Sequence, residues 1–181
     1  MKNTLALMLA GAALGFCLPA MAVTSEAKAA YAASNDKAAA DYKTDRAQCD
    51  GIKGNPKDIC IATAKATRVQ TEQEAQAQYE GTASAQASAR KKIADANFDL
   101  DKTKCASQNG NAKDVCVQQA KATMIAAQSN ATADKKVIDA RADANGDKQA
   151  ANYKVALEKC DGLAGPGKDS CIANAKTQYG Q

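Results

Sequence analysis

The stretch CDGIKGNPKDIC, from Cys49 to Cys60, recurs in altered form twice more along the chain. A second copy, CASQNGNAKDVC, begins 56 residues later, and a third, CDGLAGPGKDSC, begins after another 55 residues. Each copy has ten residues between its cysteines, a glycine five positions after the first cysteine and a Lys-Asp pair before the second. Similarity at a fixed interval predicts a chain built from repeated structural units.

The similarity extends to both sides of the cysteines. An aromatic residue stands seven positions before each first cysteine, at Tyr42, Phe98 and Tyr153, and an Ala-Lys pair follows each second cysteine. The flanks are rich in Ala, Lys, Gln, Glu and Asp and almost free of proline, so each unit is predicted to be helix, turn, helix. The units span about 33–67, 89–123 and 144–178 within a single domain of residues 23–181.

The first 22 residues, MKNTLALMLAGAALGFCLPAMA, have the pattern of a cleaved signal peptide. An early lysine is followed by an apolar run and by Ala20-Met21-Ala22, a typical cleavage site. A membrane anchor is the alternative, because the apolar run is nearly long enough to span a bilayer. Phe16 precedes Cys17, whereas lipidation requires a small residue there. We therefore expect export to the periplasm, without stable membrane insertion after cleavage.

The composition predicts helices that pack around a thin core. After residue 22 there are 37 alanines but only 18 Leu, Ile, Val, Met and Phe residues, with no tryptophan and no histidine. Alanine has the highest helix propensity but buries little apolar area. We expect an all-α protein of elongated antiparallel, coiled-coil-like hairpins, with breaks at Gly81, Ser129-Asn130 or Gly146 left open. The four helices expected are 25–51, 56–106, 112–161 and 167–180.

Each turn is predicted from glycine, asparagine and aspartate at fixed positions. The glycine would end the first helix in the left-handed conformation, and the asparagine after it would cap the second helix. Pro56 would be the first helical residue. The aspartate at the third helical position would reach back to the cap and meet the positive end of the helix dipole. These residues are Gly54, Asn55, Asp58, Gly110, Asn111 and Asp114, and, in a third unit that lacks the asparagine, Gly165 and Asp169.

The cysteine pairs have three possible roles: disulfides, redox sites or metal sites. A redox site usually shows C-x-x-C, a much closer spacing than the one seen here. A metal site needs four ligands in one place, and the chain has no histidine to contribute to them. An exported chain with an even number of cysteines favours disulfides. Among 15 possible connectivities, a helical hairpin brings each neighbouring pair into bonding range. The predicted disulfides are Cys49–Cys60, Cys105–Cys116 and Cys160–Cys171.

Several function classes find no support in the residues. The chain has no histidine general base, no Gly-rich phosphate loop and no H-E-x-x-H motif, so we expect no catalytic residue, no cofactor and no metal. Its net charge of +4 is too small and too evenly mixed for nucleic-acid binding. The repeated Lys-Asp pair is a helix cap with a solvated lysine or, alternatively, a recognition site. The three rings pack beside their disulfides or, alternatively, form a ligand stripe.

The unit Y-K-x5-C-D-x-L-x-G-x2-K-D-x-C-x3-A-K, behind a signal peptide, resembles small exported proteins of Gram-negative bacteria labelled TolA-like or cell envelope biogenesis proteins. The third unit carries it most fully, from Tyr153-Lys154 to Ala175-Lys176, and the middle unit departs from it at Phe98-Asp99 and Ala106. The resemblance implies a periplasmic helical protein without a known activity.

Two functions are compatible with these expectations. The first is a non-enzymatic structural or envelope-associated protein of the periplasm, stabilised by disulfides. The alternative is a binding module that displays three similar turns to a protein or polymer of the envelope. Self-association of the alanine-rich helices is left open.

Overall fold

The computed structural model describes residues 25–180, which fold almost entirely into helices. The predicted signal peptide, residues 1–22, lies outside this range. The elements are α1 (Ser25–Gln48), the short 3₁₀ helix η1 (Cys49–Gly51), α2 (Asn55–Glu80), α3 (Ala83–Cys105), α4 (Gly110–Asp161) and α5 (Pro166–Tyr179). No strand occurs between residues 25 and 180, and the predicted all-α class is confirmed. No helix in this range is long and apolar enough to span a bilayer.

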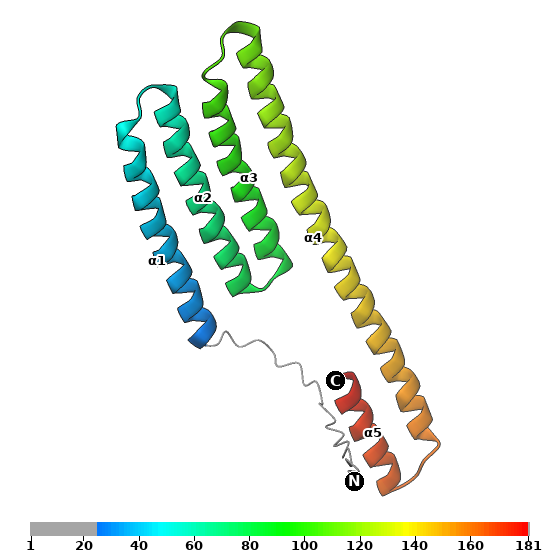
Figure 1. Ribbon diagram of the computed structural model, residues 1–181. Coiled ribbons are helices and arrows are strands. Elements are labelled where there is room, and N and C mark those ends of the chain that lie inside the picture. Colours follow the sequence, from blue (N-terminus) through cyan, green and yellow to red (C-terminus); the bar gives the residue numbers. More distant parts are fainter. Residues whose placement is uncertain (1–24, 181) are drawn as a thin grey trace, which may run out of the picture.

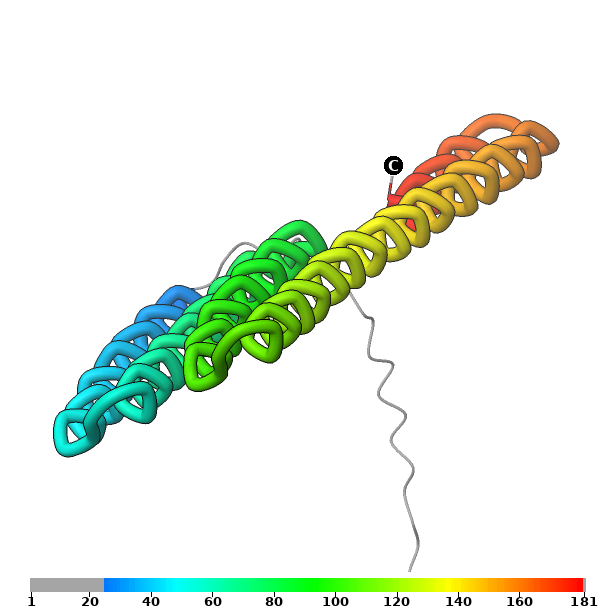
Figure 2. The backbone as a smooth tube through the Cα atoms, turned by 90° about the horizontal axis from the view of Figure 1, so that it is seen from above, coloured from blue at the N-terminus to red at the C-terminus, as the bar shows by residue number. Residues whose placement is uncertain are grey.

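The helices form a single layer, in which each one contacts only its neighbours along the chain. Helices α1, α2, α3 and the first half of α4 lie side by side and antiparallel (Figure 1). The second half of α4 extends beyond this group, and α5 folds back against its far end. Viewed from above, the four-helix group and the α4–α5 hairpin occupy opposite ends of the molecule (Figure 2). The predicted elongated hairpins are therefore confirmed.

Within the described part of the chain, the core consists of alanine and cysteine alone. Its largest fully buried side chains are three cysteines, and no polar residue between 25 and 180 is buried. Alanine lets two helix backbones approach closely, although each buried methyl group contributes little hydrophobic energy. The buried residues are Ala38, Cys49, Ala64, Ala66, Ala75, Ala85, Ala87, Ala89, Ala94, Cys105, Ala120, Ala131, Cys160 and Ala175.

The expected helix 56–106 is in fact two helices, so residues 25–180 form five α-helices where four were expected. Gly81 adopts the left-handed conformation with φ of 62°, and its N–H donates to the Ala77 carbonyl. Thr82 then caps α3, because its hydroxyl oxygen accepts a hydrogen bond from the Ala85 N–H at 3.0 Å. A left-handed glycine followed by a threonine cap ends one helix and begins the next within two residues.

Helix α4 has no such break. Its 52 residues run through Ser129-Asn130 and Gly146, so the break considered at those positions does not occur. When the units are aligned on their cysteines, Gly81-Thr82 corresponds to Val137-Ile138, which supplies neither a left-handed glycine nor a cap. A lone glycine costs a helix only about 1 kcal/mol. The result is one continuous helix of about 78 Å.

Candidate functional site: the three disulfide-bonded turns

The three predicted disulfides are present. The Cα atoms lie 5.8 Å apart in Cys49–Cys60, 5.7 Å in Cys105–Cys116 and 5.6 Å in Cys160–Cys171. In each pair the first cysteine is buried at the end of one helix, and the second is partly exposed near the start of the next. Each bridge therefore joins two antiparallel helices where the chain reverses direction. Within residues 25–180, no group of three or more acidic, cysteine or histidine side chains is arranged to hold a metal ion.

The glycine of the turn begins the second helix instead of ending the first, so its predicted role was wrong. Gly54 is the N-cap of α2 with φ of 65°, and its carbonyl accepts from the N–H groups of Lys57 and Asp58. Gly165 has φ of 59° and does the same for α5. Gly110, with φ of 54°, is the first residue of α4. Helix α1 ends in the 3₁₀ helix η1. The residue with positive φ is therefore Gly54, which directly precedes α2.

The asparagines are not caps either. Asn55 is the first residue of α2, and its Nδ2 donates a hydrogen bond of 3.0 Å to the carbonyl oxygen of Thr103. Thr103 lies in the last turn of α3, where carbonyl groups lack helical partners. The bond thus joins the first turn to a helix of the second unit. Asn111 is exposed in α4 and makes no side-chain hydrogen bond within the described chain.

The aspartates before the second cysteines make no capping box. Asp58 and Asp169 are the fourth residues of their helices, and Asp114 is the fifth residue of α4. Across residues 25–180 none of these carboxylates bonds back to a cap, since they lie four or five residues after the N-cap, whereas a capping box needs the third. Their remaining contribution is charge near the positive end of the helix dipole.

The lysine of the repeated Lys-Asp pair has a partner that the sequence analysis missed. Lys168 Nζ lies 2.9 Å from the Asp161 carboxylate, and Lys57 Nζ lies 3.7 Å from that of Asp50. Each of these aspartates directly follows the first cysteine, so the ion pair spans the turn. In the second turn that position is Ala106, and Lys113 has no ion-pair partner in the described chain. An Asp after the cysteine with a Lys seven residues later was the signal for this contact.

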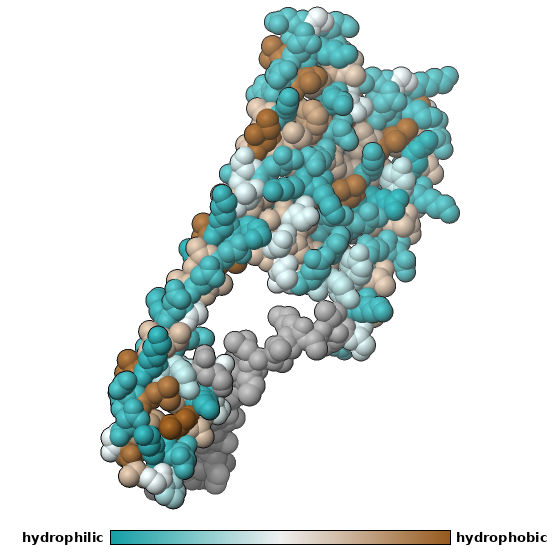
Figure 3. All heavy atoms as spheres, turned by 180° about the vertical axis from the view of Figure 1, so that it is seen from behind, coloured by the Kyte–Doolittle hydropathy of each residue, from teal (hydrophilic) through white to brown (hydrophobic). Residues whose placement is uncertain are grey.

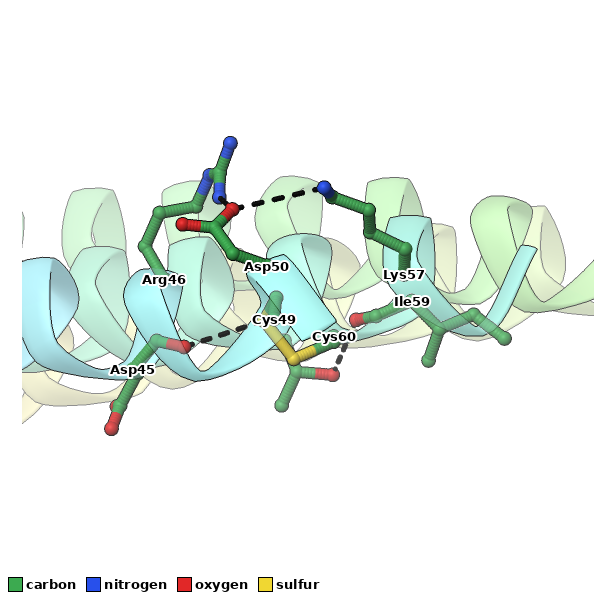
Figure 4. Close-up of a disulfide and its surroundings, with 8 residues drawn as sticks. Asp45, Arg46, Cys49, Asp50, Lys57, Ile59 and Cys60 are labelled. Carbon is green, nitrogen blue, oxygen red and sulfur yellow. Dashed lines mark hydrogen bonds and ion pairs between the residues drawn. A yellow bond between two sulfur atoms is a disulfide. The ribbon is translucent and has the colours of Figure 1, made fainter. Parts of the chain in front are cut away.

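The first turn carries an additional cation. Asp50 accepts a hydrogen bond of 2.8 Å from Arg46, and Figure 4 shows Arg46 and Lys57 approaching Asp50 from either side, above the disulfide. The hydrogen bond and charge of Arg46, with a smaller contribution from Lys57, lower the pKa of Asp50. At the third turn, the hydrogen bond to Asp161 and the attraction of its charge raise the pKa of Lys168. All five charged side chains are about a third or more exposed, so each pair contributes little net stability.

Open grooves flank the second and third disulfides at equivalent positions of the repeat. They have volumes of about 580 Å³ and 560 Å³, and the paired cysteines form part of each wall. Lys104 in the second unit corresponds to Lys159 in the third, and both line their grooves. Gln119 and Asn174 also correspond. The repeat therefore builds two similar grooves of mixed polar and apolar lining, one at each end of α4.

The three aromatic residues contact side chains that lie away from the disulfides in sequence. The Tyr42 ring lies 5.4 Å from the Arg68 guanidinium of α2, and the Tyr153 ring centroid lies 6.3 Å from that of Tyr179 on α5. Phe98 lies 5.6 Å from Lys102, one turn further along α3. Tyr42 and Tyr153 thus each contact the antiparallel helix that follows their own, about two turns from the disulfide.

No protein-family model, curated protein or solved structure matches this chain. Its function is therefore argued from the geometry of the helices and turns.

Proposed function

We propose that this protein is a non-enzymatic, disulfide-stabilised helical spacer of the bacterial periplasm, with a structural or envelope-associated role. The observation that carries the proposal is α4. This single helix holds the second and third disulfide turns at its opposite ends. The 44 residues from Cys116 to Cys160 correspond to about 66 Å along the helix axis.

The construction of the ends supports this role. A long helix is weakest where its terminal backbone groups lack partners. Here each end of α4 is covalently joined to an antiparallel neighbour through a buried cysteine. The export signal predicted in residues 1–22 and the three disulfides both fit an oxidising compartment. The resemblance to TolA-like exported proteins adds to the case for the envelope.

Small-angle X-ray scattering of the oxidised chain, without residues 1–22, tests the shape on which this role depends. A spacer gives a maximum dimension close to the length of α4 plus its turns, about 80–90 Å. The same scattering curve gives the radius of gyration, which is only about 15 Å for a compact 159-residue globule. Crosslinking in the native periplasm then tests the role, because a spacer is expected to capture envelope components at both ends.

The binding module is a second candidate, and the equivalent grooves at the second and third turns favour it. Three equal sites would lose affinity stepwise when Lys57, Lys113 and Lys168 are changed to glutamine one at a time. However, Lys57 and Lys168 already have carboxylate partners, whereas Lys113 is exposed and unpaired in the described chain. The module therefore predicts the largest loss of captured partner for Lys113→Gln, while the spacer predicts no change for any of the three.

A further inference from the structure

The outer face of α4 carries an apolar stripe along most of its length. At about 100° per residue, eight alanines and valines fall within an arc of about 60°. The buried residues Ala120, Ala131 and Cys160 lie on the opposite side of the helix, toward α3 and α5. All eight stripe residues are exposed, including Val137 at 48% and Val155 at 53%. They are Ala122, Ala126, Ala133, Val137, Ala140, Ala144, Ala151 and Val155.

This stripe is the free edge of the helical layer. Within residues 25–180, α4 contacts α3 and α5 and no other helix, and both lie on the same side of it (Figure 1). In the view from behind, brown apolar side chains recur along the left margin, which is the outer edge of α4 (Figure 3). The α2–α3 and α3–α4 interfaces are themselves lined by alanine. One more helix on the free edge would continue the same packing.

Among residues 25–180, nothing packs against the middle of α4. Every residue from 140 to 152 is exposed, because α3 begins at Ala83 and α5 ends at Tyr179. Helices gain most of their stability from tertiary packing of one face. A partner along the stripe would supply such packing where the described residues provide none.

We propose that the partner is a second copy of this chain, packed antiparallel along the stripe about a two-fold axis near Ala140. In this register Val137 lies opposite Ala144 of the second copy, and Ala126 lies opposite its Val155. Each larger side chain then meets a smaller one, and the two-fold axis makes every contact twice. This inference does not depend on the proposed spacer role.

One pair of charges beside the stripe fits the same register. Lys136 and Asp143 lie on one flank of the stripe, about 40° and 60° from its edge. Both lack an ion-pair partner in the described chain. With a two-fold axis near Ala140, Lys136 faces Asp143 of the second copy, and the pair occurs twice. In a parallel arrangement this flank would face the opposite flank of the second copy, and the two residues would not meet.

The available surface suits a reversible dimer. In the antiparallel register the helices overlap from about residue 122 to 159, or about 55 Å. A contact about 10 Å wide buries on the order of 1,100 Å² over both copies, which is typical of weak, transient interfaces and just above the roughly 1,000 Å² expected of a biological one. Each copy's four-helix group would then lie beside the other's α4–α5 hairpin.

Charge exchange in sedimentation equilibrium tests the proposal. The oxidised wild-type chain should form a concentration-dependent dimer. Lys136→Glu or Asp143→Lys alone should raise the dimer Kd at least about tenfold, because each places like charges opposite each other twice. An equimolar mixture of the two variants should restore association, since opposite charges would again face each other at both positions of the mixed dimer. Lys65→Glu, a reversal at an exposed, unpaired lysine of α2, is the matched control and should leave the Kd unchanged.

Circular dichroism verifies that every variant keeps its helices; all three positions are exposed, so folding should be unaffected. A wild-type chain that stays monomeric at all concentrations overturns the proposal. A dimer whose Kd is unchanged by both charge reversals also overturns it, and so does a dimer that the mixture of the two variants fails to restore.

Discussion

The Asn55 Nδ2 atom lies 3.0 Å from the Thr103 carbonyl oxygen, across 48 residues of sequence. This hydrogen bond is the contact that ties the first disulfide turn to the end of α3, beside the second turn. It fixes the α1–α2 hairpin against the α3–α4 hairpin at one end of the layer, opposite the Gly81 connection.

Replacing Asn55 by alanine should lower the free energy of unfolding by about 1 kcal/mol, the usual value for one intramolecular hydrogen bond. Urea denaturation under oxidising conditions measures this change in the free energy of unfolding. Asn111→Ala removes the equivalent asparagine, which makes no side-chain hydrogen bond within the described chain, and should stay within about 0.5 kcal/mol of the wild type. Equal effects for the two variants would argue against the bond.

Gly81→Ala and Gly146→Ala should change stability in opposite directions. Gly81 has φ of 62°, so alanine there is strained and should cost about 1–2 kcal/mol, although its new methyl group would meet no neighbour. Gly146 lies inside α4, where alanine should add nearly 1 kcal/mol because it favours the helix. Thermal unfolding of both variants gives the signs, and a destabilised Gly146→Ala would indicate that α4 is interrupted there.

Removal of the third disulfide should release α5 selectively. This helix has only 14 residues and contacts only α4 among the described elements. A helix so short is marginal without support, and the bridge contributes roughly 3 kcal/mol in the chain-entropy model. In Cys160→Ala/Cys171→Ala, hydrogen exchange should accelerate over residues 166–179. The matched Cys105→Ala/Cys116→Ala variant should leave α3 protected, because α3 packs between α2 and α4.

The two shifted pKa values predict opposite pH dependences. Asp50 has a lowered pKa in the folded state, so its ion pair stabilises the fold above the unfolded-state pKa and is lost as pH falls through the folded value. Lys168 has a raised pKa, so its contribution is complete below the unfolded-state pKa and is lost as pH rises through the folded value.

Nuclear magnetic resonance titration of the Asp50 carboxyl checks the acidic arm. Arg46→Gln should raise the Asp50 pKa more than Lys57→Gln does, since Arg46 is the main cause of the shift. The reverse order would show that Lys57 is the dominant partner.

Much of the architecture followed from the sequence. The repeated cysteines, ten residues apart between alanine-rich segments, predicted helical hairpins closed by Cys49–Cys60 and its two equivalents. The scarcity of large apolar residues predicted the thin core. These features depend on local spacing, helix propensity and composition, which can be read without knowing where distant segments meet. The ion pairs Lys57–Asp50 and Lys168–Asp161 were equally local, but the repeated aspartate was not connected with the lysine seven residues later.

The sequence by itself determined where the three cysteine-bonded turns lie and which cysteines pair, because those outcomes depend on residues within a dozen positions of one another. Only the tertiary structure decided that the chain folds back at Gly81 yet continues through Gly146, and that Asn55 bonds to Thr103 instead of capping its own helix. A single glycine can end a helix or be absorbed in it at a cost of about 1 kcal/mol. The outcome therefore depends on whether a cap such as Thr82 follows and whether neighbouring helices pack on both sides of the break, and sequence periodicity does not encode that packing.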